Sequence, residues 1–283
     1  MNEDLPIVSL ITPVYNGGEF IEDLILSIKN QSYPNFEHLI IDDGSEDDQA
    51  LRAILNRYPH LRWWTLGKNQ GQYSTMNEGL SSAKGEVVCF ISADDVVVPG
   101  AITCAVDFLR KDPSFDGVFG LTGYMDKDGN KLAIPTLFPL APISMVGYFA
   151  HIPHCSLYIK KPSLERNQLF FNPSLKYVGD YDWMIRIGGS PLKIGRINRE
   201  LSKVRIHPNQ ATQKFMDKSQ IERREVMKTH HINNWLRTLV TWTFHVQVRI
   251  WALNQVYKDK GLFGTIRLIF GRLRRQLNNN RRP

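Results

Sequence analysis

Short apolar runs that end in turn residues alternate with amphipathic segments along the first hundred residues. The runs are rich in β-branched side chains, as is typical of strands buried on both faces, and they cover residues 7–14, 36–41 and 86–92. Between them, apolar residues recur every four positions at Phe20, Leu24 and Ile28, and again at Ala50 and Ile54. Strands that alternate with helices of this length predict an α/β fold with a Rossmann-like, mostly parallel sheet flanked by helices.

Polar residues follow each of the three predicted strands. The first strand is followed by Tyr15-Asn-Gly-Gly18, the second by Asp42-Asp-Gly-Ser45 and the third by Asp94-Asp95. Ligands of parallel sheets bind beyond the carboxyl ends of the strands, so we expect these segments to form one site. Adjacent carboxylates at a buried strand end are costly without a positive charge, and they suit a hard divalent cation shared with a diphosphate. The alternative for Asp94-Asp95 is an acidic turn that caps the helix beginning near Pro99.

Length and composition predict an ordinary globular protein. The chain has 283 residues, of which 42% are hydrophobic and 22% charged, enough to bury a sizeable core. The three cysteines, Cys89, Cys104 and Cys155, lack metal-ligand spacing, and we expect them to pack rather than react. The first residues show no signal-peptide pattern, and no window is apolar enough for a spanning helix. We therefore expect a cytoplasmic location.

Charge is distributed unevenly between the two ends of the chain. Residues 221–283 contain 13 Lys and Arg against 3 Asp and Glu, a net +10. Because the whole chain carries +7, the first 220 residues carry about −3. A near-neutral main body argues against an enzyme that binds nucleic acid. We predict a catalytic domain over residues 1–218 and a basic amphipathic helical tail over residues 219–283.

The tail shows two apolar stripes at helical spacing. The first, over residues 235–257, is unusually broad, although residues 242–250 also alternate with the period of a strand. The second, over residues 262–277, is surrounded by arginines. A basic amphipathic helix of this kind can bind an anionic membrane surface. The alternative is packing against the catalytic domain or a partner subunit.

Several ordered motifs resemble the family 2 glycosyltransferases of GT-A fold, over about residues 7–210. The motifs are Val8-Ser-Leu-Ile-Thr-Pro-Val-Tyr-Asn16, Ile40-Ile-Asp-Asp-Gly-Ser45, Asn69-Gln-Gly-Gln-Tyr-Ser-Thr-Met-Asn77, Ala83-Lys-Gly-Glu86, Ser92-Ala-Asp-Asp95, Gly179-Asp-Tyr-Asp-Trp-Met-Ile-Arg186 and Arg205-Ile-His207. The resemblance implies a nucleotide-diphosphate sugar as the donor, with a UDP-sugar favoured. It also implies transfer of one sugar to a hydroxyl of a glycan or lipid-linked acceptor, as in surface polysaccharide biosynthesis.

The resemblance places the nucleotide near the first two strand ends. It implies that Thr12, Pro13 and Tyr15 line the nucleotide pocket and that Asp42 or Asp43 accepts a hydrogen bond from the base. We favour Asp43, while a helix-capping turn is the alternative for both acids. Asn77 is expected to face the nucleotide as well.

The acidic motif implies a bound Mg²⁺ or Mn²⁺. By resemblance, Asp95 binds the cation, Asp94 contacts the ribose or a metal-bound water, and His207 contacts the metal or the diphosphate. A structural role is the alternative for His207. Ser92 stands where many members of the family have an aspartate, so the first carboxylate of the family's motif is absent from this chain.

Asp180 is the expected catalytic base, which removes the proton from the acceptor hydroxyl in inverting members of the family. Asp182 is the alternative, and helix capping is a further interpretation of Asp180. On one helix the two side chains would point about 200° apart, so they cannot share a role. Gly179 stands where the family usually has an acid. The acceptor or donor-sugar pocket is expected to include His154, Trp183 and Arg186.

Other functions fit the sequence less well. A processive synthase would need spanning helices and a Gln-x-x-Arg-Trp motif. A sugar nucleotidyltransferase would need an Arg-containing, Gly-rich phosphate loop, and a dinucleotide-dependent dehydrogenase would need G-x-G-x-x-G. A zinc site at His151, His154 and Cys155 lacks a fourth ligand nearby. The main rival is a catalytically inactive nucleotide-sugar-binding or scaffolding protein, which Ser92 and Gly179 favour. The sequence does not indicate the oligomeric state.

Overall fold

The computed structural model describes residues 5–46, 48–132, 154–210 and 214–232. The first compact unit of the chain extends to Ile232. The two predicted tail helices and His151 lie outside the described residues.

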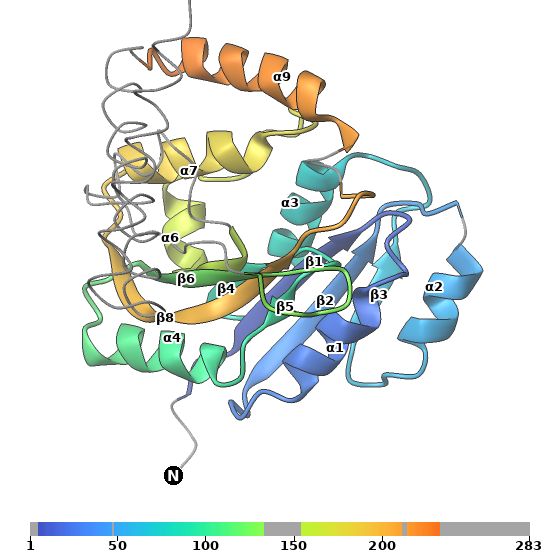
Figure 1. Ribbon diagram of the computed structural model, residues 1–283. Coiled ribbons are helices and arrows are strands. Elements are labelled where there is room, and N and C mark those ends of the chain that lie inside the picture. Colours follow the sequence, from blue (N-terminus) through green and yellow to red (C-terminus); the bar gives the residue numbers. More distant parts are fainter. Residues whose placement is uncertain (1–4, 47, 133–153, 211–213, 233–283) are drawn as a thin grey trace, which may run out of the picture. The chain divides into compact units, whose positions relative to one another are not determined.

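In the described part of the chain, eight strands form one sheet in the order β3-β2-β1-β4-β7-β6-β8-β5 (Figure 1). The strands are β1 Val8–Val14, β2 Phe36–Asp42, β3 Arg62–Thr65, β4 Val87–Phe90, β5 Val96–Val97, β6 Gly117–Met125, β7 Leu157–Lys160 and β8 Ile194–Arg205. Strands β3, β2, β1 and β4 are mutually parallel, as are β6 and β8. Strand β7 is antiparallel to both neighbours, and β5 is antiparallel to β8. The mostly parallel sheet and its three predicted strands are therefore confirmed.

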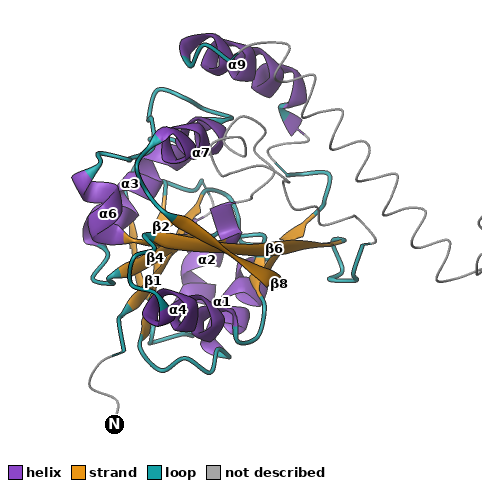
Figure 2. Cartoon of the chain, turned by 90° about the vertical axis from the view of Figure 1, so that its left-hand side faces the viewer, coloured by secondary structure: helices purple, strands orange, loops and turns teal. Residues whose placement is uncertain are grey.

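Helices cover both faces of the sheet. The helices of the described residues are α1 Ile21–Lys29, α2 Asp48–Leu55, α3 Gln72–Ser82, α4 Ala101–Lys111, α6 Lys161–Arg166, α7 Gly179–Gly189 and α9 Met216–Thr229. Figure 2 shows α1 and α4 on one side of the sheet, with α3, α6 and α7 on the other. Side chains of neighbouring strand positions point to opposite faces, so Leu10 and Cys89 pack with α1 and α4, whereas Ile11 and Phe90 pack with α3 and α7. Burial on both faces explains why these strands are continuous apolar runs.

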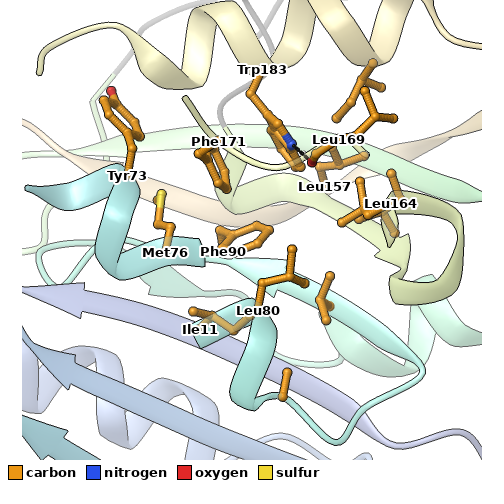
Figure 3. Close-up of a cluster of buried hydrophobic side chains, with 14 of the residues drawn as sticks. Ile11, Tyr73, Met76, Leu80, Phe90, Leu157, Leu164, Leu169, Phe171 and Trp183 are labelled. Carbon is orange, nitrogen blue, oxygen red and sulfur yellow. Dashed lines mark hydrogen bonds between the residues drawn. The ribbon is translucent and has the colours of Figure 1, made fainter. Parts of the chain in front are cut away.

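The face under α3 and α7 contains a cluster of aromatic rings (Figure 3). Trp183 stacks on Phe171 with ring centroids 4.5 Å apart, and its indole N–H donates to the Leu169 carbonyl at 2.7 Å. Only 1% of Trp183 is exposed. The predicted place of Trp183 in a substrate pocket is corrected, because its ring and its indole N–H both have partners inside the core.

Helix α9 packs against the helix that carries Asp180. Val226 and Met227 of α9 are buried with Tyr181 and Ile185 of α7. The Glu222 carboxylate accepts hydrogen bonds from the backbone N–H groups of residues 176–178, at 2.8, 2.6 and 2.9 Å. The predicted domain boundary after residue 218 falls inside α9. Among the described helices, none combines the length and apolar character needed to cross a membrane.

Candidate active site

The acidic turn after β4 and the end of β8 lie side by side. Strand β5, which follows Asp95, pairs with β8 through Val97 and Ser202. This pairing brings His207 to the turn, where its Nε2 lies 3.1 Å from Asp94 Oδ2. The side chains of Asp94 and His207 are 25% and 10% exposed. The structure therefore places Asp94, which is predicted to contact the ribose or a metal-bound water, beside His207, which is predicted to contact the metal or the diphosphate.

Arg205 holds the Asp94-Asp95 turn in place through hydrogen bonds. Its side chain is buried, and its Nε donates to the Asp94 carbonyl at 3.0 Å. The guanidinium also donates to the Lys127 carbonyl and to the Asp23 carboxylate, at 2.9 and 2.7 Å. The backbone N–H of Arg205 donates to Asp95 Oδ1 at 3.1 Å. The sequence contained this residue only as part of the Arg205-Ile-His207 motif, and its partners on three other segments could not be read from it.

Asp95 is only 4% exposed, and this burial raises the pKa of its carboxyl well above the ordinary value. The neighbouring Asp94 charge raises the pKa further, while the Arg205 backbone N–H opposes the rise. Two adjacent carboxylates, one deeply buried, form a site where a divalent cation would offset the cost of burying charge. Asp94, Asp95 and His207 offer the oxygen and nitrogen donors that would hold Mg²⁺ or Mn²⁺. Within the described ranges, no group of three or more such side chains is already arranged as a metal site.

Asp180 begins the first turn of α7, and its two carboxylate oxygens have different surroundings. Oδ1 accepts from the Tyr181 backbone N–H at 2.8 Å and from the Tyr73 hydroxyl at 3.2 Å. Oδ2 lies 3.9 Å from Nδ1 of His154, and the Asp180 side chain is 43% exposed. Among the described residues, Oδ1 receives both of these hydrogen bonds and Oδ2 receives none, so Oδ2 is left for an external donor.

His154 connects the two halves of the site. Its Nε2 lies 3.4 Å from Ser92 Oγ, while its buried Nδ1 faces Asp180 without a hydrogen-bond partner among the described residues. Burial lowers the pKa of His154, and the charges of Asp180 and Asp94 oppose that shift. A neutral imidazole thus lies between the acidic turn and Asp180. His154 lies between Ser92 and Asp180, and its place in the acceptor or donor-sugar pocket stays a prediction.

Asp182 points away from this centre. It is buried, and its carboxylate accepts from Nε of Arg186 at 2.8 Å and lies 2.7 Å from Nε2 of His230. Arg186 also donates to the Phe170 carbonyl at 2.6 Å. The Arg186 side chain is 27% exposed, and its place in a substrate pocket stays a prediction. Of the two acids, only Asp180 lies beside His154.

The loops after β1 and β2 are joined to each other. The backbone N–H of Asn16 donates to Ser45 Oγ, and the backbone N–H of Glu46 donates to Asn16 Oδ1, both at 2.9 Å. Tyr15 is 44% exposed on this joined surface, and its hydroxyl donates to Glu46 at 3.2 Å. The predicted aromatic wall is therefore open to a ligand.

Asp42 and Asp43 are both buried, and the carboxylate of each accepts hydrogen bonds from nearby backbone N–H groups. Asp42 accepts from the backbone N–H and the hydroxyl of Ser45, at 3.0 and 2.6 Å. Asp43 accepts from the backbone N–H groups of Gln70 and Gly71, at 2.8 and 2.9 Å. Asp43 thereby links the second strand end to the start of α3. Its contact with the base stays a prediction.

Three other expected nucleotide contacts have internal partners or are buried. The Asn77 amide donates to the Phe171 carbonyl and accepts from the Phe171 N–H, both at 2.8 Å, so it clamps that backbone. Thr12 and Pro13 are buried in β1, and Thr12 Oγ1 lies 3.0 Å from Nε2 of His38. The side chains of Asn77 and Thr12 support the site from inside, which corrects the expected direct contacts.

His38 gives the fold a specific sensitivity to acid. Burial lowers its pKa to about 3, so the folded protein keeps it neutral where the unfolded chain binds a proton. Stability from this residue is complete above the ordinary pKa of about 6.5 and falls by about 1.4 kcal/mol per pH unit as the pH drops toward 3. Urea unfolding of His38→Gln should show a shallower loss of stability below pH 6.5 than wild type. Equal slopes for the two proteins would contradict this assignment.

Comparisons with known proteins identify the family of this chain. The family model described as glycosyl transferase family 2 matches residues 9–167. An uncharacterized glycosyltransferase of Rickettsia typhi is 30% identical over 240 residues, which cover 78% of this chain and 70% of that protein. A Bacillus subtilis glycosyltransferase named for teichuronic acid biosynthesis, TuaG, is 34% identical over 133 residues, 45% of this chain and 51% of that protein.

The chain spans about a third of the length of two further relatives, from Rickettsia felis and Rickettsia conorii (36% and 35%). Among solved structures, residues 1–349 of S. aureus TarS in complex with UDP-GlcNAc match with a TM-score of 0.63 at 19% identity. That match covers 76% of this chain and 66% of the TarS chain. The complex of the same protein with UDP matches with a TM-score of 0.58 at 20% identity, over 76% and 64% of the two chains. This chain belongs to glycosyl transferase family 2 and has the GT-A fold that its motifs predicted.

Proposed function

We propose that this glycosyltransferase is an inverting, metal-assisted enzyme that moves a sugar from a UDP-sugar to a hydroxyl of a glycan or lipid-linked acceptor. The observation that carries the proposal is the position of Asp180. The Asp180 side chain is 43% exposed and its Oδ2 faces His154, which contacts the acidic turn through Ser92. A base beside a diphosphate and cation site is the arrangement that direct displacement at a sugar carbon requires.

In this mechanism Asp180 Oδ2 accepts the proton of the acceptor hydroxyl as its oxygen bonds to the anomeric carbon. The bond from that carbon to the donor phosphate breaks on the opposite side, which inverts the configuration. Asp94, Asp95 and His207 would hold Mg²⁺ or Mn²⁺, which supplies positive charge for the departing diphosphate. The neutral His154 adds no positive charge beside Asp180, so the carboxylate is not neutralised by a fixed ion pair.

Uridine as the base is supported by the joined loops and by the structural relatives. Exposed Tyr15 offers an aromatic face, and buried Asp43 is the acid that we expect to accept the uracil N–H. TarS was solved with UDP and with UDP-GlcNAc. The name of TuaG refers to teichuronic acid biosynthesis, which is consistent with a role in surface polysaccharide assembly for this chain.

Thermal unfolding with a panel of nucleotide sugars tests the donor. With Mn²⁺ present, a UDP-sugar at a hundred times its Kd should stabilise the protein by about 2.7 kcal/mol, and GDP-mannose should not. Release of UDP from the preferred sugar then separates an enzyme from an inactive binding protein. Stabilisation without any turnover, with glycan or lipid-linked acceptors added, would favour the binding or scaffolding alternative.

The basic tail extends the proposal to a location. We propose a cytoplasmic enzyme that is peripheral to the inner face of the membrane, because the net +10 of residues 221–283 suits an anionic lipid surface. Co-sedimentation with anionic and neutral liposomes tests this proposal, with a protein that ends at residue 232 as the control. Equal retention of the two proteins would exclude the tail as the membrane contact.

A further inference from the structure

We propose that Tyr73 is a positioning residue for the catalytic base, and that Gly179 is the residue that makes room for it. The inference rests on the proposed function, in which Asp180 is that base. The Tyr73 hydroxyl donates to Asp180 Oδ1 at 3.2 Å across 107 residues of sequence. With the Tyr181 N–H on the same oxygen, this contact fixes the carboxylate and leaves Oδ2 for the acceptor.

The environment of Tyr73 keeps its hydroxyl a donor. Only 3% of the residue is exposed, and burial raises its pKa well above 10, with the Asp180 charge adding to the rise. Figure 3 shows the ring at one end of the aromatic cluster, with its hydroxyl pointing away from Met76. The ring stacks on Phe171 at 5.8 Å, and Asn77 clamps the Phe171 backbone. The donor is therefore held by the rigid core rather than by a loop.

The Tyr73 ring can lie beside Asp180 because Gly179 has no side chain. A Cβ added at position 179 would lie 2.5 Å from Cδ2 and 2.6 Å from Cε2 of Tyr73, closer than real Cβ contacts. The acid that the family usually has at this position therefore cannot coexist with the Tyr73 ring in its present place. In the sequence, the glycine at position 179 favoured an inactive protein, because the family usually has an acid there. In the structure, the glycine leaves room for the Tyr73 ring, whose hydroxyl supports Asp180.

The test compares Tyr73→Phe, which removes only the hydroxyl, with wild type in full-length protein. UDP release is measured with Mn²⁺ and whichever of UDP-glucose, UDP-galactose, UDP-GlcNAc and UDP-GalNAc gives the highest turnover. We expect kcat to fall by about tenfold while KM for the donor stays within about twofold, because the lost bond orients the base and does not bind the donor. Tyr33→Phe is the matched control, since it removes a buried hydroxyl that donates to the Pro6 carbonyl, away from the site. We expect that control to keep the wild-type kcat.

A double-mutant cycle tests the part played by Gly179. Gly179→Ala should lower kcat in wild type by displacing the ring, but it should lower kcat no further in Tyr73→Phe, where no hydroxyl remains to be displaced. Its effect on the melting temperature should be the same in both backgrounds, because the ring is present in both. A full loss of kcat in both backgrounds would overturn the role of Gly179.

The outcomes separate this inference from the proposed function. An inactive Asp180→Asn together with an unchanged kcat in Tyr73→Phe would overturn the positioning role and leave the base assignment intact. An active Asp180→Asn would overturn both. A parallel fall of kcat and a rise of KM in Tyr73→Phe, accompanied by the same change in Tyr33→Phe, would show a general loss of stability and overturn the inference as well.

Discussion

Asp180→Asn is expected to lower kcat by about 10²–10⁴-fold while the UDP-sugar still binds. The range is the usual contribution of a general base, and asparagine keeps the size of the side chain but cannot take up the acceptor proton. The asparagine carbonyl oxygen can still accept from Tyr73 and Tyr181, so the local structure should remain. The measurement is kcat and donor KM with Mn²⁺, together with donor-induced thermal stabilisation.

Asp182→Asn is the matched control on the same helix. Its carboxylate pairs with Arg186 and His230 and does not face His154, so we expect a loss of stability with little change in kcat. If Asp182→Asn abolished turnover while Asp180→Asn kept it, the choice between the two acids would be wrong. Loss of donor binding in Asp180→Asn would instead indicate a donor contact.

Asp95→Asn is expected to lower kcat/KM by at least about 10²-fold while making the metal-free protein more stable at neutral pH. The loss of activity follows from removing one buried oxygen charge from the cation and diphosphate site. The gain in stability follows from the raised pKa of Asp95, which shows that burial disfavours its ionised form. Asparagine avoids that cost and can still accept the Arg205 N–H.

The stability gained by Asp95→Asn depends on pH. A carboxyl whose folded pKa is raised binds its proton more tightly in the folded state, so its contribution to stability is lost as the pH rises above the ordinary value of about 3.9. The advantage of Asp95→Asn should therefore be small near pH 4 and grow toward the raised pKa. Urea unfolding with chelator, and again with Mn²⁺, measures both effects, with exposed Asp107→Asn as the control. Mn²⁺ should stabilise wild type and not Asp95→Asn, and equal stabilisation of both would contradict a metal role for Asp95.

Much of the fold was predictable because it depends on local patterns. Strands buried on both faces must be continuous apolar runs, and this property located β1, β2 and β4 to within a few residues. The spacing of Leu24 and Ile28 likewise predicted α1. The rule that ligands bind beyond the carboxyl ends of parallel strands predicted that the acidic turn lies at that end of the sheet. His207 lies beside Asp94, as expected if the two motifs belong to one site.

The roles of individual side chains depend on distant segments and were harder to predict. Asn77 and Trp183 lie in motifs of the site, yet Phe171 and Leu169, which neither motif contains, engage them in the core. A motif places a residue on a helix but does not state which face of that helix meets the core.

The alternation of strands and helices, the positions of the strand-end acids and the family can be read from the amino-acid sequence, because each depends on a continuous stretch of chain. The folded structure is needed to show which oxygen of Asp180 lacks a hydrogen bond from the described residues, how His154 lies between Ser92 and Asp180, and why position 179 is a glycine. These features arise where segments far apart in the chain meet, and their distances are set by the packing of α3 and α7 on the sheet.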